Sequence, residues 1–329
     1  MFRKLLISLI AGSVMLAACT PAVTPAPLPA VTQAPPSPLP PSATAPLPTS
    51  TTISLTYTDG LGRTLTFSGP AQRVVSLAAS NTEILYAVGA GAQVVGRDEA
   101  SNYPEAAASV PTVGGWGGFS NEAIVALKPD LVLAGGITSP ELVASLEQLG
   151  LTVYLLPNPT TLEELFTNLE TVGALTGHDA DAATLVASLK ARVAAVDAKV
   201  ATVTSRPTVF YEFDATDPTK PYTYGPGTFG DLLIQRAGGT NIGAQLPDPW
   251  AQISLEQLVV ANPEMLLLGD AAYGETPEKV SARPGWETLS AIKTGKVFPF
   301  NDDLVSRPGP RLVDGLEALA KLLHPELFK

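Results

Sequence analysis

The chain has 329 residues, of which 45% are hydrophobic, and its mean hydropathy is +0.21. That length suits about two domains of ~100–200 residues, and the composition is too apolar for a disordered protein. The 20 Lys and Arg against 31 Asp and Glu give a formal charge of −11, which argues against nucleic-acid binding because phosphate contacts need clustered cations. One Cys and two His are too few for a zinc site, an iron–sulfur cluster or a disulfide framework. We therefore expect no metal bound directly by the protein.

Residues 1–19 have the pattern of an export signal. Arg3 and Lys4 precede an apolar stretch, residues 5–15, that is too short to span ~30 Å of hydrocarbon as a helix. Small residues then lead to Cys19, the only cysteine of the chain, as in a bacterial lipoprotein signal peptide with a lipobox. We expect the thiol of Cys19 to carry a diacylglycerol that anchors the protein on the extracytoplasmic side of the membrane. The alternative is an ordinary cleaved signal peptide in which Cys19 has no role.

Residues 20–52 change composition abruptly to Pro, Ala, Thr and Ser. No charged residue occurs between Leu5 and Thr58, and the prolines prevent a helix or a strand ladder. We interpret the segment as an extended, Pro-rich linker that holds a folded domain away from the lipid. A ligand tract for an SH3-type domain is the alternative, and it has little use outside the cell.

Residues 53–160 alternate between short apolar runs and helical patterns. Strands are predicted at residues 74–77, 94–96, 131–134 and 153–156. The segment Ser80-Asn-Thr-Glu83 is interpreted as a capped helix start with an acid in its first turn. This alternation predicts a parallel, doubly wound sheet, which we assign to an N-terminal lobe.

Residues 161–205 contain no strand candidate and are predicted to be helical. One apolar stripe repeats at steps of three and four and predicts a helix of roughly 22 residues; its members are Leu185, Leu189, Val193, Val196, Val200 and Val203. Strand candidates return at residues 208–211, 265–268 and 297–300, which places a C-terminal lobe at residues 206–329. The predicted fold class is therefore α/β, with two doubly wound lobes joined by one long helix.

An internal repeat connects the two lobes. Trp116 and Trp250, Glu122 and Glu256, and the prolines at 129 and 263 are pairs separated by one and the same interval along the chain. Each copy predicts a loop with Trp, a short helix that begins near Glu, a turn at Pro and then a buried strand. Glutamates at helix starts also complement the helix dipole, and a lone Trp usually packs in its loop, so each residue has a structural interpretation. Because both residue types occur in pairs, we favour a functional interpretation: the two tryptophans face each other across a cleft, and the two glutamates form separate negatively charged contact points.

Several segments together resemble the periplasmic-binding family for cobalamin, iron–siderophores and haem. They lie at residues 73–85, 94–97, 102–104, 113–115, 124–132, 227–233, 237–242 and 250–256, and in Arg307-Pro-Gly-Pro-Arg311. The resemblance covers nearly all of the predicted folded part, and it implies that the long backbone helix is rigid and that the ligand cleft lies between the two lobes. It implies the substrate-binding component of an ABC importer, a monomer that captures a corrinoid or a ferric siderophore and delivers it to a permease dimer with its ATPase subunits. It also implies that Glu122 and Glu256 dock onto arginines of the permease. Two such charges steer the encounter of the binding protein with the permease and fix their relative orientation.

The resemblance also suggests which side chains line the ligand cleft. Trp116 and Trp250 match positions where cobalamin-binding members place aromatic residues, and a flat macrocycle suits stacking on such rings. Tyr222 and Tyr224 are further candidates, although they also fit turn packing. Arg307 would pair with an acidic siderophore. In every case the ligand carries its own metal, so no cofactor of the protein is expected.

Two departures from the cobalamin-binding pattern leave the ligand open. Leu304 stands where such members carry a further Trp, and Ala100 stands at an aromatic position. Arg311 is a second candidate for a siderophore, or a charge at the start of a helix. A surface-anchored hydrolase and a non-transport scaffold module are the competing functions, but we expect no enzyme because the chain has no Gly-x-Ser-x-Gly motif and neither His lies in a catalytic pattern.

Overall fold

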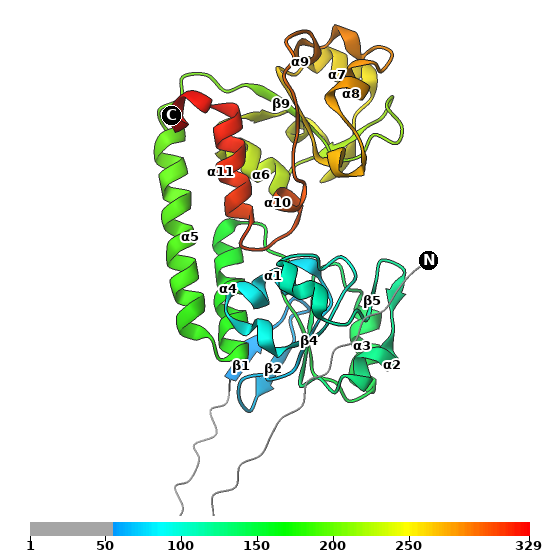
Figure 1. The fold of residues 1–329 in the computed structure, drawn as a ribbon, viewed down its shortest axis with the longest axis vertical. Coiled ribbons are helices and arrows are strands. Elements are labelled where there is room, and N and C mark those ends of the chain that lie inside the picture. Colours follow the sequence, from blue (N-terminus) through cyan, green and yellow to red (C-terminus); the bar gives the residue numbers. More distant parts are fainter. Residues whose placement is uncertain (1–54) are drawn as a thin grey trace, which may run out of the picture. The chain divides into compact units, whose positions relative to one another are not determined.

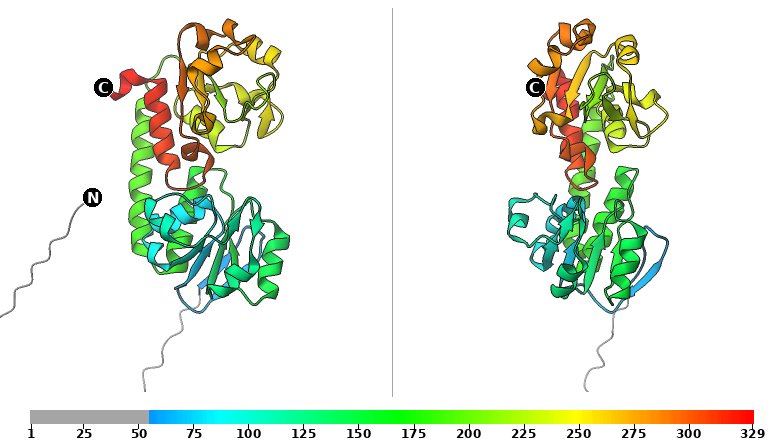
Figure 2. Two further views of the ribbon diagram at one scale, coloured as in Figure 1. Left: turned by 45° about the vertical axis from the view of Figure 1, so that its right-hand side comes forward. Right: turned by 90° about the vertical axis from the view of Figure 1, so that its right-hand side faces the viewer.

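The computed structural model describes residues 55–329, which lie within one compact unit. The predicted signal peptide, Cys19 and the Pro-rich linker lie outside the described residues. Among residues 55–329, no helix combines the length and the apolar composition needed to cross a bilayer. Figures 1 and 2 show two α/β lobes with a long helix, α5, along one side of both.

The N-terminal lobe is built on a parallel sheet of order β4-β3-β7-β8. Its strands are β3 (Val74–Ser76), β4 (Val94–Arg97), β7 (Leu131–Ala134) and β8 (Val153–Leu155). The helices are α1 (Ala79–Ala87), α2 (Asn121–Ala126), α3 (Pro140–Gln148) and α4 (Leu162–Thr176), and two hairpins are added, β1 (Leu55–Thr58) with β2 (Thr64–Phe67) and β5 (Gly114–Gly115) with β6 (Gly118–Phe119). The four strands of the parallel sheet begin at the predicted residues, whereas the two hairpins were not predicted.

The C-terminal lobe repeats this plan with a parallel sheet of order β11-β9-β13-β14. Its strands are β9 (Thr208–Glu212), β11 (Thr240–Asn241), β13 (Met265–Leu268) and β14 (Val297–Pro299), and β10 (Tyr222–Tyr224) pairs with β12 (Trp250–Gln252). The helices are α6 (Phe229–Arg236), α7 (Leu255–Ala261), α8 (Pro277–Ser281), α9 (Ser290–Lys293), α10 (Asp303–Ser306) and α11 (Leu312–Leu323). In chain order both sheets run second, first, third, fourth strand, so the lobes share one topology.

Both sheets are covered on two faces, because successive strand residues enter different cores. In β3, Val74 belongs to a large central core and Val75 to a core under α2 and α3. In β9, Val209 belongs to the same central core and Phe210 to a core under α7 and α9. Alternating burial on both faces is what a doubly wound sheet requires, so the predicted fold class is confirmed.

Helix α5 (Asp179–Val200) has 22 residues and packs against α4 on one lobe and α11 on the other. The residues of its predicted apolar stripe are buried, except for Leu185 and Val203, which are partly buried. Val203 lies beyond the end of the helix. The stripe completes the central core, which contains residues of both sheets. A left-handed Gly177, with φ of 76°, ends α4 and lets the chain turn into α5.

The sequence repeat is a structural repeat. Strands β7 and β13 begin at the interval that separates the paired tryptophans, and each follows a turn at a left-handed residue, Lys128 with φ of 47° or Asn262 with φ of 44°. The acid after each proline then accepts from backbone N–H groups at the start of the neighbouring strand: Asp130 from Arg73 at 2.9 Å and Glu264 from Thr208 at 2.9 Å. This contact explains why a carboxylate stands at that point in both copies.

Candidate functional site

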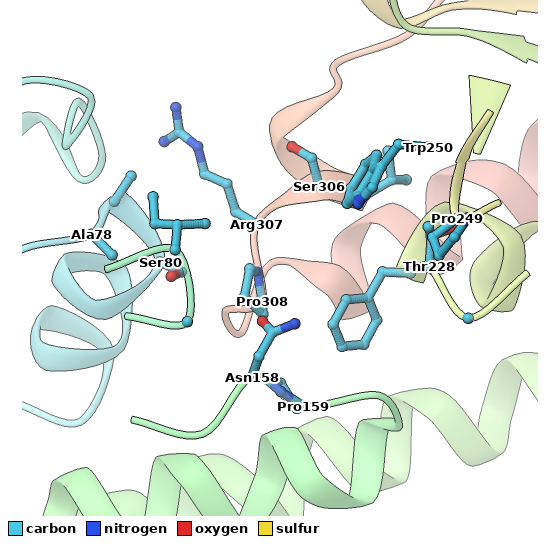
Figure 3. Close-up of a pocket in the computed structure, with 16 residues that line it drawn as sticks. Ala78, Ser80, Asn158, Pro159, Thr228, Pro249, Trp250, Ser306, Arg307 and Pro308 are labelled. Atoms are coloured by element: carbon cyan, nitrogen blue, oxygen red, sulfur yellow. The ribbon is translucent and has the colours of Figure 1, made fainter. Parts of the chain in front are cut away.

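A cavity of about 440 Å³ lies between the lobes. The N-terminal lobe supplies residues that follow β3, β7 and β8, and the C-terminal lobe supplies residues around α6, β12 and α10; they are residues 78–80, 136–137, 158–159, 227–229, 249–250 and 305–308. In Figure 3, Ala78 and Ser80 stand on one side of this space and Trp250 on the other. The volume is within the ~300–1,000 Å³ of ligand sites, and the place outside the carboxyl ends of parallel strands is where α/β sheets bind ligands.

Trp250 and Phe229 are the aromatic side chains that line the cavity, and Trp250 is the larger of the two. It is 58% exposed, and its ring is held from behind by Tyr224, at 5.5 Å between centroids, and by Phe213, at 5.9 Å. Both contacts are edge-to-face, and Phe213 and Tyr224 stack on each other at 4.9 Å. A ring supported in this way presents a fixed apolar face to a ligand at little cost in side-chain entropy.

Tyr224 supports this wall and does not line the cavity. It is only 2% exposed, and its hydroxyl donates to Asp302 at 2.6 Å. Burial, followed by the charge of Asp302, raises the pKa of Tyr224 well above its ordinary value, so the hydroxyl keeps its proton. The expectation of a cleft position for Tyr224 is therefore wrong, because this residue ends strand β10 and its ring packs inward against Tyr211 and Phe213. Tyr222 is partly exposed beside Phe213 and also lies outside the cavity lining.

Arg307 lines the cavity, but its guanidinium is already paired. It donates to Asn102 at 2.8 Å and to Glu83 at 3.2 Å, and it contacts Asp303 at 2.8 Å. Arg311 forms a two-bond pair with Glu83, at 2.8 and 2.5 Å. Because Glu83 belongs to α1 and both arginines to the C-terminal lobe, these contacts form an inter-lobe ion cluster.

The sequence interpretation missed Glu83 as the partner of these arginines. Helix α1 begins at Ala79, the preceding Ala78 makes no side-chain cap, and Glu83 lies beyond the first turn, so the expected capped start at residues 80–83 is wrong. A fully buried carboxylate needs a cation. The signal was present as a charge inside a helix whose following residues, Ile84 and Leu85, are apolar.

Trp116 stands apart from Trp250. It occupies the turn between β5 and β6, is 96% exposed and is not part of the cavity lining. Its backbone N–H donates to Glu99 at 2.9 Å, which fixes the turn rather than the ring. The structure therefore does not bring the two tryptophans together across the cavity.

Glu122 and Glu256 occupy equivalent places on the two lobes. Each is the second residue of a short helix that a serine caps: Ser120 accepts from the N–H of Ala123 at 3.1 Å, and Ser254 accepts from that of Gln257 at 3.2 Å. Both glutamates are exposed. Hydrogen bonds from its own backbone N–H and from Ser254 lower the pKa of Glu256, so this carboxylate is charged at neutral pH.

The described residues offer no direct metal site, since they contain no group of three or more His, Cys, Asp or Glu side chains able to hold an ion. What the arrangement offers is a cavity between two lobes, one fixed aromatic face, a neutralised pair of arginines, and two exposed carboxylates.

Comparisons with known proteins agree with this geometry. The sequence profile described as "Periplasmic binding protein" matches residues 74–304. An uncharacterized ABC transporter substrate-binding lipoprotein of Bacillus subtilis, YvrC, is 32% identical over 84% of this chain and 87% of its own length. A vitamin B12-binding protein of Photorhabdus laumondii is 32% identical over 77% of this chain and 88% of its own.

Solved structures give the same result. The periplasmic vitamin B12-binding protein BtuF of Vibrio cholerae has a TM-score of 0.67 at 29% identity, covering 79% of this chain and 99% of that one. The periplasmic haem-binding protein BhuT has a TM-score of 0.71 at 26% identity, covering 79% and 100%. With a family match over most of the folded part and two relatives at 32% identity along nearly their whole length, the chain belongs to the periplasmic binding protein family.

Proposed function

We propose that this protein is the extracytoplasmic substrate-binding component of an ABC importer and that it carries a corrinoid. The observation that carries the ligand assignment is the wall of Trp250, supported by Phe213 and Tyr224, beside a cavity whose lining arginine, Arg307, is already paired. A macrocycle with a flat, partly apolar face and uncharged amide side arms fits such a wall. Vitamin B12-binding relatives at 29–32% identity support the same choice.

An acidic chelate fits this cavity less well. Arg307 and Arg311 would have to leave Glu83 to bind it, and a fully buried Glu83 without its partners is costly. A neutral ferric hydroxamate is the second candidate, because it needs no free cation. A hydroxamate-transport protein of Saccharomonospora viridis, with a TM-score of 0.66 at 28% identity, supports it. The relatives are named as binding or transport proteins, which favours binding over a hydrolase.

Docking on the permease is assigned to Glu122 and Glu256. Both are exposed, sit at matched places on the two lobes and add to an acidic chain, so they suit recognition by two arginine patches. We expect Glu122→Lys or Glu256→Lys to abolish uptake in cells and to leave the ligand Kd within about twofold, because rim charges act on encounter and register.

A matched control exists on α3. Glu141 is also an exposed glutamate at the second position of a serine-capped helix, so Glu141→Lys makes the same change in the same local structure. That variant should transport normally. Equal loss of uptake in all three variants, or a large loss of ligand affinity in the first two, would contradict the docking assignment.

The membrane anchor is proposed from the sequence alone. A lipidated Cys19 followed by the Pro-rich linker would hold a monomeric binding protein near its permease. Cys19→Ser should move the protein from the membrane fraction to the soluble fraction. Retention of the serine variant in the membrane would contradict lipidation at this residue.

A further inference from the structure

The two short helices that carry the docking glutamates also carry exposed valines. Val125 on α2 is 39% exposed, and Val259 on α7 is 37% exposed. The same interval along the chain separates these valines as separates Glu122 from Glu256, so they are counterparts in the internal repeat. In Figure 1, α2 and α7 belong to different lobes, and each lies on the side of its lobe that is away from α5.

Each valine lies beside its glutamate on the surface of the helix. Residues three apart on an α-helix are neighbours on one face, with about 5–6 Å between their Cβ atoms. One residue between them, Ile124 on α2 or Leu258 on α7, is fully buried and fixes the rotation of the helix. On α7 the next residue, Val260, is 86% exposed and enlarges the apolar surface, whereas its counterpart on α2 is the smaller Ala126.

The stability of the helices does not explain these valines. Valine is a poorer helix former than alanine, lysine or glutamate, and more than a third of each residue faces water. Three other helices of the described chain, α3, α4 and α8, also begin with a capping Ser or Thr and have Glu in second place. Three positions after that Glu they have Ala144, Phe166 and Ser281, of which Phe166 is buried and the other two are small. An exposed valine beside the glutamate therefore distinguishes α2 and α7.

The charges beside the valines indicate what covers them. Within residues 55–329, neither Glu122 nor Glu256 forms an ion pair. Each lobe thus presents an unpaired carboxylate next to an apolar side chain, which complements a partner that has an arginine next to an apolar side chain at two equivalent places. A dimeric permease has two equivalent places. A second copy of this acidic chain would bring further carboxylates to the same contact, and like charges repel.

We propose that Val125 on one lobe, and Val259 with Val260 on the other, form the apolar part of the permease-docking surface and pack against apolar side chains that flank the permease arginines. This proposal rests on the proposed function, because it deepens the docking assigned to Glu122 and Glu256. The two parts of the surface act on different steps. The carboxylates steer the encounter and so set the association rate, whereas the valines lose their water only in the docked complex and so slow its dissociation.

The first experiment identifies the partner by crosslinking. The full-length protein with Cys19→Ser and Val259→Cys has one thiol, which is labelled with benzophenone maleimide. The labelled protein is added to spheroplasts of the bacterium that makes it and is irradiated. We expect a product that contains the membrane-spanning subunit of an ABC importer, identified by mass spectrometry. The same label at Ala144→Cys on α3 should not yield that product. A product that contains a second copy of this chain, or no importer subunit, would overturn the proposal.

The second experiment measures docking on that permease, held with its ATPase subunits in lipid nanodiscs. Val125→Thr and Val259→Thr keep the shape of the side chain and replace one methyl group by a hydroxyl. Each should raise the dissociation rate constant about fivefold, and Val259→Thr with Val260→Thr about tenfold or more, while the association rate constant changes less than about twofold. These ratios should not depend on the NaCl concentration. Glu122→Lys and Glu256→Lys should instead lower the association rate constant, most strongly at low salt.

A matched control and the pattern of losses decide the outcome. Ala144→Thr introduces the same side chain at the corresponding place of α3 and should dock as wild type does. Normal dissociation of the valine variants, with docking lost in the glutamate variants, would overturn the apolar contact and leave the charge assignment standing. If neither set changes docking, the docking assignment fails and the proposal fails with it. Faster dissociation in the valine variants alone would support the apolar contact and contradict the role of the glutamates. Circular dichroism checks that every variant is folded.

Discussion

The inter-lobe ion cluster gives a sharp prediction about stability. Glu83 has a fully buried side chain and accepts three hydrogen bonds from two arginines, at 2.5, 2.8 and 3.2 Å. Glu83→Gln keeps the size of the side chain but leaves both guanidinium groups without their main counter-charge. Breaking a buried pair from one side costs about 3–5 kcal/mol. Because Asp303 still contacts both arginines, we expect the lower end, about 3 kcal/mol of unfolding free energy.

The chain contains a matched control for burial. Glu317 on α11 also forms a two-bond pair with an arginine, Arg192, at 2.8 and 2.7 Å, but its side chain is 39% exposed. Glu317→Gln therefore makes the same chemical change in water-screened surroundings and should cost no more than about 1 kcal/mol.

The assay is urea unfolding at pH 7, followed by far-ultraviolet circular dichroism and tryptophan fluorescence. One core runs through both lobes, so a single transition with an unchanged m value is expected in both variants. Equal losses for Glu83→Gln and Glu317→Gln, or a loss below about 1 kcal/mol for Glu83→Gln, would refute the account of a buried inter-lobe cluster.

Two further predictions concern the cavity and Asp270, a buried carboxyl that follows β13. Trp250→Ala should weaken corrinoid binding by about tenfold or more, since it removes most of the aromatic contact with the ligand. Trp116→Ala should have the smaller effect, because Trp116 lies outside the cavity. Fluorescence titration of both variants checks this, and a larger effect of Trp116→Ala would place the ligand elsewhere. The pKa of Asp270 is raised to about 7, from about 3.9 in an unfolded chain, so protonation stabilises the fold at low pH and this stabilisation is lost as the pH rises through 7. The stability of wild type relative to Asp270→Asn should therefore fall between pH 5 and pH 8 in thermal unfolding, and a constant difference would show that Asp270 titrates normally.

Much of the fold was predictable because it depends on local patterns. The apolar stripe of α5 follows the periodicity of a single helix, and the two copies of the internal repeat resemble each other in their order of residues. Both features can therefore be recognised in the sequence without knowledge of the tertiary contacts. The cavity was harder because its contacts join distant residues. Glu83 and Arg311 are separated by 228 positions, and no pattern near either one indicates the other.

The aromatic residues show the same limit. Whether a tyrosine of a short strand faces a ligand or the core depends on how the strand packs. Tyr224 on β10 faces the core, where its hydroxyl donates a hydrogen bond to Asp302, 78 positions away. Trp116 and Trp250 share a place in the repeat, but one stands at a hairpin tip and the other on a paired strand. Equivalent positions in the sequence therefore did not give equivalent positions at the cavity.

Corrinoid binding is tested by a fluorescence titration of the full chain with cyanocobalamin, cobinamide, a neutral ferric hydroxamate, an acidic siderophore and haem. We expect saturable binding of a corrinoid, with quenching that Trp250→Phe alters, and weaker binding of the acidic ligands. Tight binding of haem or the acidic siderophore without binding of any corrinoid would contradict the corrinoid assignment.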